Sequence, residues 1–292
     1  MGTRFHLILP DLDDDTAEFV FIKVQNEVNR IESKISRFLP DSEISLLNRT
    51  AFSKPVCVST EVYEALKVCH HYFDLTQGAF NISIRPLLQF WANNTNNSEH
   101  LSDPADLLNK LNKKCINFDD ANQTISFDNE HVEIDLGGFG KGYALGKIDT
   151  ILDDYSIENA FISFGESSIL TRGCQPGGDY WKIGVKDYKN PNQALHTFSI
   201  NEGSVSTSSN FFVGDDGKLR NHRHVINPFT GYPVEDIITL SVSAESPVTA
   251  EILSTAFLVL PENEVRSITK NMKNVTAVKV NYSTGNYEAA IL

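Results

Sequence analysis

The chain has 292 residues, of which 41% are hydrophobic and 22% charged. These proportions are typical of a soluble globular protein with a sizeable core, and they exclude intrinsic disorder as the main state. The formal net charge of −13 argues against general nucleic-acid binding and against an anionic membrane surface as partner. A phosphorylated ligand is still compatible with this charge, because a helix N-terminus or a metal ion supplies a local positive field.

The sequence shows no targeting or membrane segment. No run approaches the roughly 18 consecutive apolar residues of a transmembrane helix, and no signal peptide is visible. We therefore expect a cytoplasmic protein, or a periplasmic or membrane-anchored one if a leader has been trimmed. The cysteines are widely spaced and form no CxxC pair, which favours buried thiols over a zinc site or a disulfide framework; they are Cys57, Cys69, Cys115 and Cys174.

The first part of the chain is predicted to be mostly helical. Alternating apolar residues over 3–9 indicate a strand, and helical spacing over 17–35 indicates a long amphipathic helix with Asp14 or Asp15 as N-cap. Shorter helical segments are expected over 44–48, 60–75 and from Asp103–Pro104 to Leu111. A polar loop is expected over 93–102.

The later part is predicted to be dominated by strands. They are expected at 116–118, 124–127, 132–136, 160–164, 168–172, 181–185, 196–200, 237–244, 277–280 and 287–291. Two further helices are expected at about 140–152 and 248–260. No linker or internal repeat divides the chain, so the pattern predicts a mixed α+β fold with mainly antiparallel sheets.

The strongest local signal runs from Glu133 to Ala144, where four glycines fall within six positions between a strand and a helix. Glycines let the backbone approach a ligand closely and aim N–H groups at a phosphate. Lys141 adds a positive charge, and Asp135 ends the strand, where a carboxylate binds a hydroxyl or a cation. The segment is neither a Walker P-loop nor the dinucleotide fingerprint. A ligand loop is favoured over a plain tight turn.

Two other segments carry weaker signals. His224 precedes a tight Asn-Pro, Thr-Gly turn and is a candidate base or metal ligand, although a structural histidine explains it equally well. Glu251, Ser254 and Thr255 fall at i, i+3 and i+4, so they share one helix face and offer oxygen ligands for a hard cation such as Mg²⁺. Taken alone, this last segment favours a capped helix start.

Taken together and in this order, these segments resemble the FAD:protein FMN transferase family, long labelled thiamine-biosynthesis lipoproteins, over nearly the whole chain. The resemblance implies a T-fold-related α+β architecture, with residues 1–292 forming a single domain of two closely packed lobes. It implies binding of FAD and Mg²⁺ and transfer of FMN to a threonine hydroxyl of an acceptor flavoprotein, with release of AMP. The alternatives are an FAD pyrophosphatase yielding FMN and AMP, or a flavin-binding protein without catalysis. An FAD-dependent redox enzyme fits poorly, because no nicotinamide fingerprint is present.

The resemblance also implies roles for individual residues. Met1 matches a methionine at the adenosine end, and Phe38 matches an aromatic residue that packs on the adenine. Further contacts with FAD are implied for Ala79, Phe80, Asn81, Asp135, Lys141 and Ile226. The metal ligands would be Gly138, through its carbonyl group, with Glu251, Ser254 and Thr255. His224 and Lys141 are the catalytic candidates, the first as base for the threonine and the second as charge partner of the pyrophosphate.

The chain departs from the family pattern at several positions. Glu251 stands where the family typically has Asp, and Asn81 also stands where Asp is usual. Because Glu reaches one methylene further and Mg²⁺ is strict about octahedral geometry, we expect a weaker metal site. The family often has Gly-Asp-Tyr where this chain has Ser209-Asn210-Phe211. We expect the fold to be retained and the transferase activity to be the property at risk.

Overall fold

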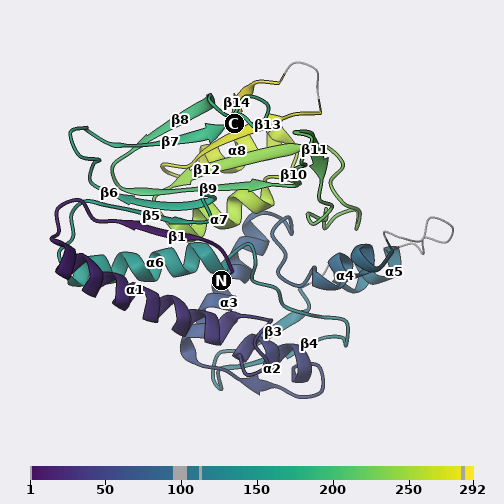
Figure 1. The fold of residues 1–292 in the computed structure, drawn as a ribbon. Helices are drawn as coiled ribbons and strands as arrows, with labels where there is room; N and C mark the ends of the chain where they lie inside the picture. Colours follow the sequence, from purple (N-terminus) through teal and green to yellow (C-terminus); the bar gives the residue numbers. More distant parts are fainter. Residues whose placement is uncertain (1, 95–103, 112–113, 284–286) are drawn as a thin grey trace. The chain divides into compact units, whose positions relative to one another are not determined.

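The computed structural model describes residues 2–94, 104–111, 114–283 and 287–292 (Figure 1). The chain groups into two compact units. Unit 1 comprises Met1–Arg30, Phe139–His222 and Asp236–Leu292, and unit 2 comprises Ile31–Gly138 and Arg223–Glu235. Helix α1 (Asp14–Ile35) therefore contributes residues to both units.

A seven-stranded sheet forms the centre of unit 1, and every neighbouring pair in it is antiparallel. In spatial order the strands are β1 (Phe5–Ile8), β5 (Ala160–Phe164), β6 (Ser168–Arg172), β9 (Gly203–Ser209), β12 (Ile238–Ala244), β13 (Thr276–Asn281) and β14 (Ala289–Ile291). Strand β12 is buried at almost every position, as expected for a strand with both faces covered.

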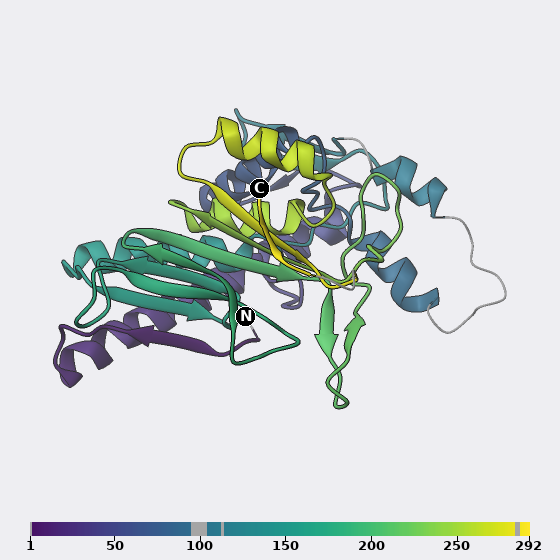
Figure 2. The ribbon, with the colours of Figure 1, turned by 90° about the horizontal axis from the view of Figure 1, so that it is seen from above.

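Helices and a hairpin cover the two faces of this sheet. Helices α6 (Gly140–Asp154) and α7 (Pro247–Ala256) pack on each other and on β6 and β9, while α8 (Glu262–Asn271) contacts β13 (Figure 1). The hairpin of β7 (Trp181–Lys186) and β8 (Ala194–Ile200) packs on the other face, where Ile183 and Phe198 join Val205 and Val278 in one apolar cluster. A second hairpin, β10 (Phe211–Val213) with β11 (Leu219–Asn221), extends away from the sheet (Figure 2).

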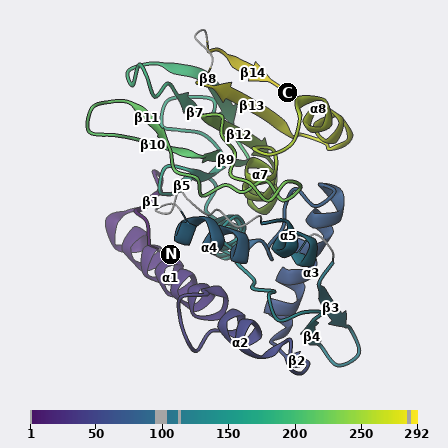
Figure 3. The ribbon, with the colours of Figure 1, turned by 90° about the vertical axis from the view of Figure 1, so that its right-hand side faces the viewer.

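Unit 2 combines short helices with a small antiparallel sheet (Figure 3). The helices are α2 (Glu43–Thr50), α3 (Thr60–Leu75), α4 (Arg85–Asn94) and α5 (Ala105–Leu111), and the strands are β2 (Val56–Cys57), β4 (Thr124–Phe127) and β3 (Ile116–Asp119) in that spatial order. Ser42 and Ser59 begin α2 and α3, because each side chain accepts a hydrogen bond from a backbone N–H of the first turn. Leu47, Leu66 and Ile125 form part of the fully buried core.

The predicted fold class, helices mixed with antiparallel sheets, is confirmed. One predicted strand is wrong: residues 132–136 make only an isolated bridge, between Glu133 and Ile84. The reason is that the side chain of Asn48 bonds both the N–H (2.7 Å) and the carbonyl (3.0 Å) of Ile134, in place of a neighbouring strand. The N-cap of α1 is also corrected, because Asp13 accepts the N–H of Thr16 (2.9 Å) and Asp14 begins the helix.

Some elements are additional to those expected. Helices α4 and α8 and strands β9, β10 and β11 lie in segments for which the sequence predicted no element. Of the predicted polar loop at 93–102, residues 93 and 94 end α4, and the rest lies outside the described residues, as does Asp103. Within the described part of the chain, no helix combines the length and apolar character that crossing a membrane requires.

Candidate functional site

The predicted site residues of unit 1 lie where α6 and α7 approach each other closely. Gly142, near the start of α6, makes the approach possible: a Cβ there would lie 2.5 Å from the Pro247 carbonyl oxygen and 2.7 Å from the Cβ of Glu251. No side chain fits in this space, so Gly142 is required for the close packing of α6 on α7. The packing brings Lys141 of α6 to Glu251 of α7.

The carboxylate of Glu251 is buried and fully engaged. The residue is 4% exposed. Its Oε1 lies 3.0 Å from Lys141 Nζ, and its Oε2 accepts hydrogen bonds from Ser168 Oγ (2.5 Å) and Ser206 Oγ (2.7 Å). Lys141 Nζ also donates to Ser167 Oγ (2.8 Å) and Ser168 Oγ (2.7 Å). A buried charge needs such a partner and such donors to be stable in a protein interior.

The other predicted metal residues continue this set of polar contacts. Ser254 Oγ donates to the Glu251 carbonyl (3.0 Å) and lies 2.8 Å from Ser208 Oγ. Thr255 Oγ1 donates to the same carbonyl (3.3 Å) and lies 3.4 Å from Ser208 Oγ. We call the connected set the Lys–Glu network: Lys141, Ser167, Ser168, Ser206, Ser208, Glu251, Ser254 and Thr255.

The members of this network on α6 and α7 were predicted from the sequence, whereas its serines outside these helices were not. Ser168 lies on β6, and Ser206 and Ser208 lie on β9, where residues two apart point to the same face of the sheet. The alternation of serines over 204–208 was the available signal. It predicts a strand whose polar face meets another polar group.

The donor chemistry of the network suits a hard cation only in part. Carboxylate and hydroxyl oxygens are the ligands that Mg²⁺ takes. However, a cation at Oε1 of Glu251 would meet the Lys141 ammonium, which is already 3.0 Å away. Among the described residues, no group of three or more His, Cys, Asp or Glu could hold a metal ion. The Lys–Glu network therefore offers one carboxylate, already partly neutralised by Lys141, and a cation bound there would need further anionic ligands.

Two predicted FAD contacts of unit 2, Phe38 and Asp135, are connected through Arg37, for which the sequence predicted no role. Asp135 Oδ2 lies 2.7 Å from Arg37 Nε, and Asp135 Oδ1 accepts the N–H of Gly137 (2.9 Å). The guanidinium carbon of Arg37 lies 3.8 Å from the centre of the Phe38 ring. Phe38 itself is 75% exposed. Phe38 and Asp135 thus lie on either side of one arginine.

The segment Ala79–Asn81 turns away from α3 and is largely internal. Ala79 and Phe80 are buried. Asn81 Oδ1 accepts from Ser83 N (2.9 Å) and Ser83 Oγ (2.7 Å), and Asn81 Nδ2 donates to the Leu111 carbonyl (3.2 Å). Both ends of this side chain therefore hold the loop, and an aspartate here would place an oxygen against the Leu111 carbonyl.

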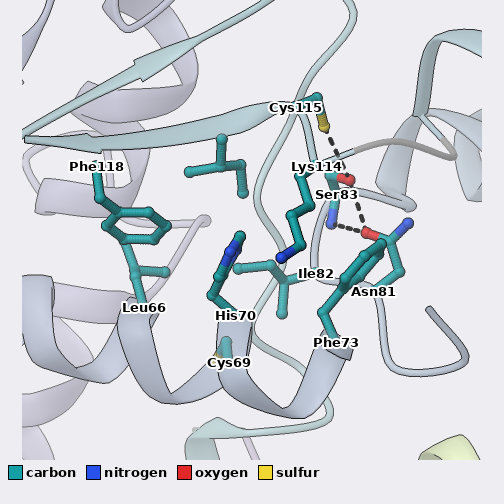
Figure 4. A pocket seen from close by; sticks show the side chains of 11 residues that line it. Leu66, Cys69, His70, Phe73, Asn81, Ile82, Ser83, Lys114, Cys115 and Phe118 are labelled. Carbon is teal, nitrogen blue, oxygen red and sulfur yellow. Dashed lines mark hydrogen bonds between the residues drawn. The ribbon is translucent and has the colours of Figure 1, made fainter. Parts of the chain in front are cut away.

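Asn81 also lines a pocket in unit 2, between α3 and the segments around Ser83 and Cys115 (Figure 4). The empty volume is about 330 Å³, part of it open solvent. Burial lowers the pKa of His70 and raises the pKa of the Cys69 and Cys115 thiols. Both thiols are therefore protonated at neutral pH, and neither is an activated nucleophile.

The remaining predicted residues of unit 2 lie at its turns. His224 is exposed and Ile226 is buried, and Ile226 bridges to Pro233 across the Asn-Pro, Thr-Gly turn. Trp91 Nε1 anchors this turn by donating to the Gly231 carbonyl (2.7 Å). Gly138 is partly exposed, and Met1 lies outside the described residues.

The departure at Ser209-Asn210-Phe211 has a structural explanation. Asn210 is fully buried; its Nδ2 donates to the Asp236 carbonyl (2.6 Å), and its Oδ1 accepts the N–H of Ile238 (2.9 Å). Phe211 is buried against Tyr188, with ring centres 5.0 Å apart. These two side chains hold the base of the β10–β11 hairpin, Asn210 through its hydrogen bonds and Phe211 through its packing on Tyr188.

Comparison with known proteins finds relatives that are named as flavin transferases. A relative in Haemophilus influenzae named FAD:protein FMN transferase is 24% identical over 300 residues, covering 98% of this chain and 85% of that protein. A relative of the same name in Chlamydia trachomatis is 26% identical over 273 residues, covering 88% and 82%.

Solved structures agree with these relatives. The ApbE protein of Thermotoga maritima shares 27% identity and a TM-score of 0.81, covering 100% of this chain and 93% of that one. The flavin transferase ApbE of Vibrio cholerae has the same fold, with a TM-score of 0.81 at 20% identity, covering 100% and 94%. The profile of the ApbE family matches residues 1–279. The family resemblance of the sequence is thereby confirmed, and the chain belongs to the ApbE family.

Proposed function

We propose that this chain is an FAD:protein FMN transferase, which moves FMN from FAD to a threonine hydroxyl of an acceptor flavoprotein and releases AMP, with Mg²⁺ as its metal. One observation carries the proposal beyond the names of its relatives. Helix α6 has no side-chain hydrogen bond at its N-cap, Phe139, and Lys141 stands in its first turn beside the Ser167 and Ser168 hydroxyl groups and the Glu251 carboxylate of α7. An open helix N-terminus with a lysine suits a pyrophosphate.

The chemistry proposed is a displacement at phosphorus. The threonine oxygen attacks the phosphorus of the FMN half, the bond from that phosphorus to the bridging oxygen breaks, and AMP leaves with that oxygen. Lys141 and the N–H groups of α6 neutralise charge on the pyrophosphate oxygens. His224 takes the threonine proton, since imidazole is the side chain that titrates near neutral pH.

Magnesium, when bound, would supply additional charge neutralisation on the phosphates. The residues proposed to hold it are Glu251, Ser254 and Thr255, with the carbonyl of Gly138. Because Lys141 already neutralises part of the Glu251 charge, the phosphates of FAD should complete the ligand set. Metal and FAD should therefore each tighten the binding of the other. Phe38, Asp135, the segment Ala79–Asn81, Ile226 and Met1 are proposed to hold the nucleotide.

A flavin-binding protein without catalysis is the second candidate. The engagement of Glu251 favours it, because both carboxylate oxygens already have partners inside unit 1. The two candidates differ in a single measurable product, which is AMP.

The test is incubation with FAD, Mg²⁺ and a threonine-bearing acceptor peptide. We expect an added FMN on the peptide by mass spectrometry and an equal amount of AMP by chromatography. FMN in place of FAD, a chelator, or a Thr→Ala peptide should each prevent the adduct. K141M should lower the rate, whereas K147M, on the same helix but outside the Lys–Glu network, should not. AMP without an adduct would support the pyrophosphatase, and bound FAD without AMP would support the flavin binder; either contradicts the proposal.

A further inference from the structure

Arg37 lies between two side chains that the family resemblance assigns to the nucleotide, although no role was assigned to Arg37 itself. Its guanidinium covers one face of the Phe38 ring at 3.8 Å, within the range of a cation–π contact. Most of the remaining ring surface is open, since Phe38 is 75% exposed. An exposed aromatic ring with a cation on its other face is suited to stacking with a nucleobase.

Most hydrogen-bond donors of Arg37 are unused. A guanidinium has five N–H groups. Nε lies 2.7 Å from Asp135 Oδ2, yet its N–H is not aligned with that oxygen or with any other acceptor, so the contact is an ion pair without a good hydrogen bond. Within the described residues, the two terminal amino groups donate to no protein acceptor. The side chain is 22% exposed, so a ligand can reach it.

Two hydrogen bonds close the neighbouring turn without the Arg37 side chain. The turn between α1 and α2 is closed by Ser42 Oγ, which donates to the Ser36 carbonyl (2.6 Å), and by Arg49 Nη1, which donates to the Pro40 carbonyl (2.8 Å). Arg37 takes part in neither contact. Its position against Phe38 and Asp135 therefore needs an explanation other than closure of the turn.

We propose that Arg37 binds the adenylate half of FAD and so makes the chain prefer FAD to FMN. Phe38 stacks the base, and the terminal amino groups of Arg37 donate to acceptor atoms of the adenylate. Arg37 also fixes the carboxylate of Asp135, whose remaining lone pairs suit ribose hydroxyls. The inference rests on the proposed function for its ligand, but it concerns binding and not transfer.

The ligand class follows from the charges and the geometry. Asp135 alone would repel a phosphate, whereas the pair of Arg37 and Asp135 has no net charge and offers unused N–H donors on one side. A planar guanidinium receives phosphate and carboxylate oxygens in pairs, which a lysine cannot do. FMN lacks the adenine base and the ribose attached to it, so Arg37, Phe38 and Asp135 should not increase its affinity.

The experiment compares R37M, R37K and R85M by calorimetry with AMP, FAD and FMN. Arg85 is the matched control, because its Nε forms an ion pair of similar length with Glu133 (2.6 Å) in the same unit. R37M should weaken AMP and FAD about tenfold or more, the effect of losing hydrogen bonds to a charged group. R37K should recover only part of this loss, and R85M should bind as wild type. FMN affinity should be the same in all four proteins.

The outcomes separate this inference from the proposed function. A mutant R37M that binds AMP and FAD as tightly as wild type would overturn the role of Arg37, whatever the transfer assay shows. So would an equal loss for FMN, or a wild type that binds no adenylate. Urea unfolding of R37M and R37K provides the check on folding. If wild type binds AMP through Arg37 but transfers no FMN, the inference stands and the transferase proposal fails.

Discussion

Gly142 and Gly146 allow the packing of α6 on α7 to be tested by one substitution at two positions. Both lie in α6, so replacing either by alanine should gain about 0.5–1 kcal/mol of helix stability. At Gly146 the new Cβ would lie 3.7 Å from Pro247 Cγ, which is an ordinary contact. At Gly142 it would lie 2.5 Å from the Pro247 carbonyl oxygen and 2.7 Å from Glu251 Cβ.

The two substitutions should therefore have opposite signs. G146A should stabilise the protein by about 0.5 kcal/mol or slightly more. G142A must push α7 away by roughly 1 Å to reach normal contact distances, and such overpacking costs about 1–3 kcal/mol, less the gain in helix propensity. Urea unfolding should show the midpoint rising for G146A and falling for G142A at constant m. A mutant G142A as stable as G146A would refute the reasoning, because α6 and α7 would then not be in close contact.

Three further results are expected. K141M should lower the unfolding free energy by about 2–4 kcal/mol, because it leaves the Glu251 carboxylate buried without its cation. The double mutant K141M/E251Q should lose less than the sum of the two single mutants, and additive losses would argue against an interaction between Lys141 and Glu251. Burial lowers the pKa of His70 below 6.5, so the unfolded chain takes up a proton first and stability should fall as the pH drops below about 6.5. H70Q should lose that part of the decline, and equal pH slopes would contradict it. Iodoacetamide should label the exposed Cys57 in the native protein, whereas Cys69, whose pKa is raised by burial, should react only after unfolding. Mass spectrometry of the first labelled species checks this order, and labelling of Cys69 before Cys57 would contradict it.

A continuous apolar period made helix α1 predictable, whereas buried polar residues obscured strand β9. Helix α1 follows the spacing of its buried residues Val20, Val24 and Ile31. Strand β9 was missed because Ser204 and Ser206 occupy core positions where apolar residues are expected. Their hydroxyls are satisfied there, since Ser204 Oγ donates to the Ile169 carbonyl (2.5 Å) and Ser206 Oγ to Glu251. Burial of a polar group depends on partners that a local pattern does not contain.

In the candidate site, too, some residues were predictable from the sequence while their contacts were not. Lys141 and Glu251 were selected from local segments, but their contact joins positions 110 residues apart, since 251 − 141 = 110. Ser168 is 83 residues from Glu251. A single sequence carries no signal for such pairings, which are fixed by strand order and helix packing. Arg37 was missed for a related reason: an arginine between a helix and a turn reads as a solvated charge until its neighbours are known.

The contacts of the Glu251 carboxylate inside unit 1 explain why a glutamate suits this position. It meets Lys141 from α6, Ser168 from β6 and Ser206 from β9, at distances between 2.5 and 3.0 Å. An aspartate on the same backbone would withdraw the carboxylate by about one C–C bond, roughly 1.5 Å, which is enough to break ordinary hydrogen bonds. The longer side chain therefore stabilises the resting protein, and it does so by engaging the same oxygens that a metal would use. Lys141 thus already occupies the Glu251 carboxylate that the proposed metal site would require, so a divalent cation would have to compete with this lysine.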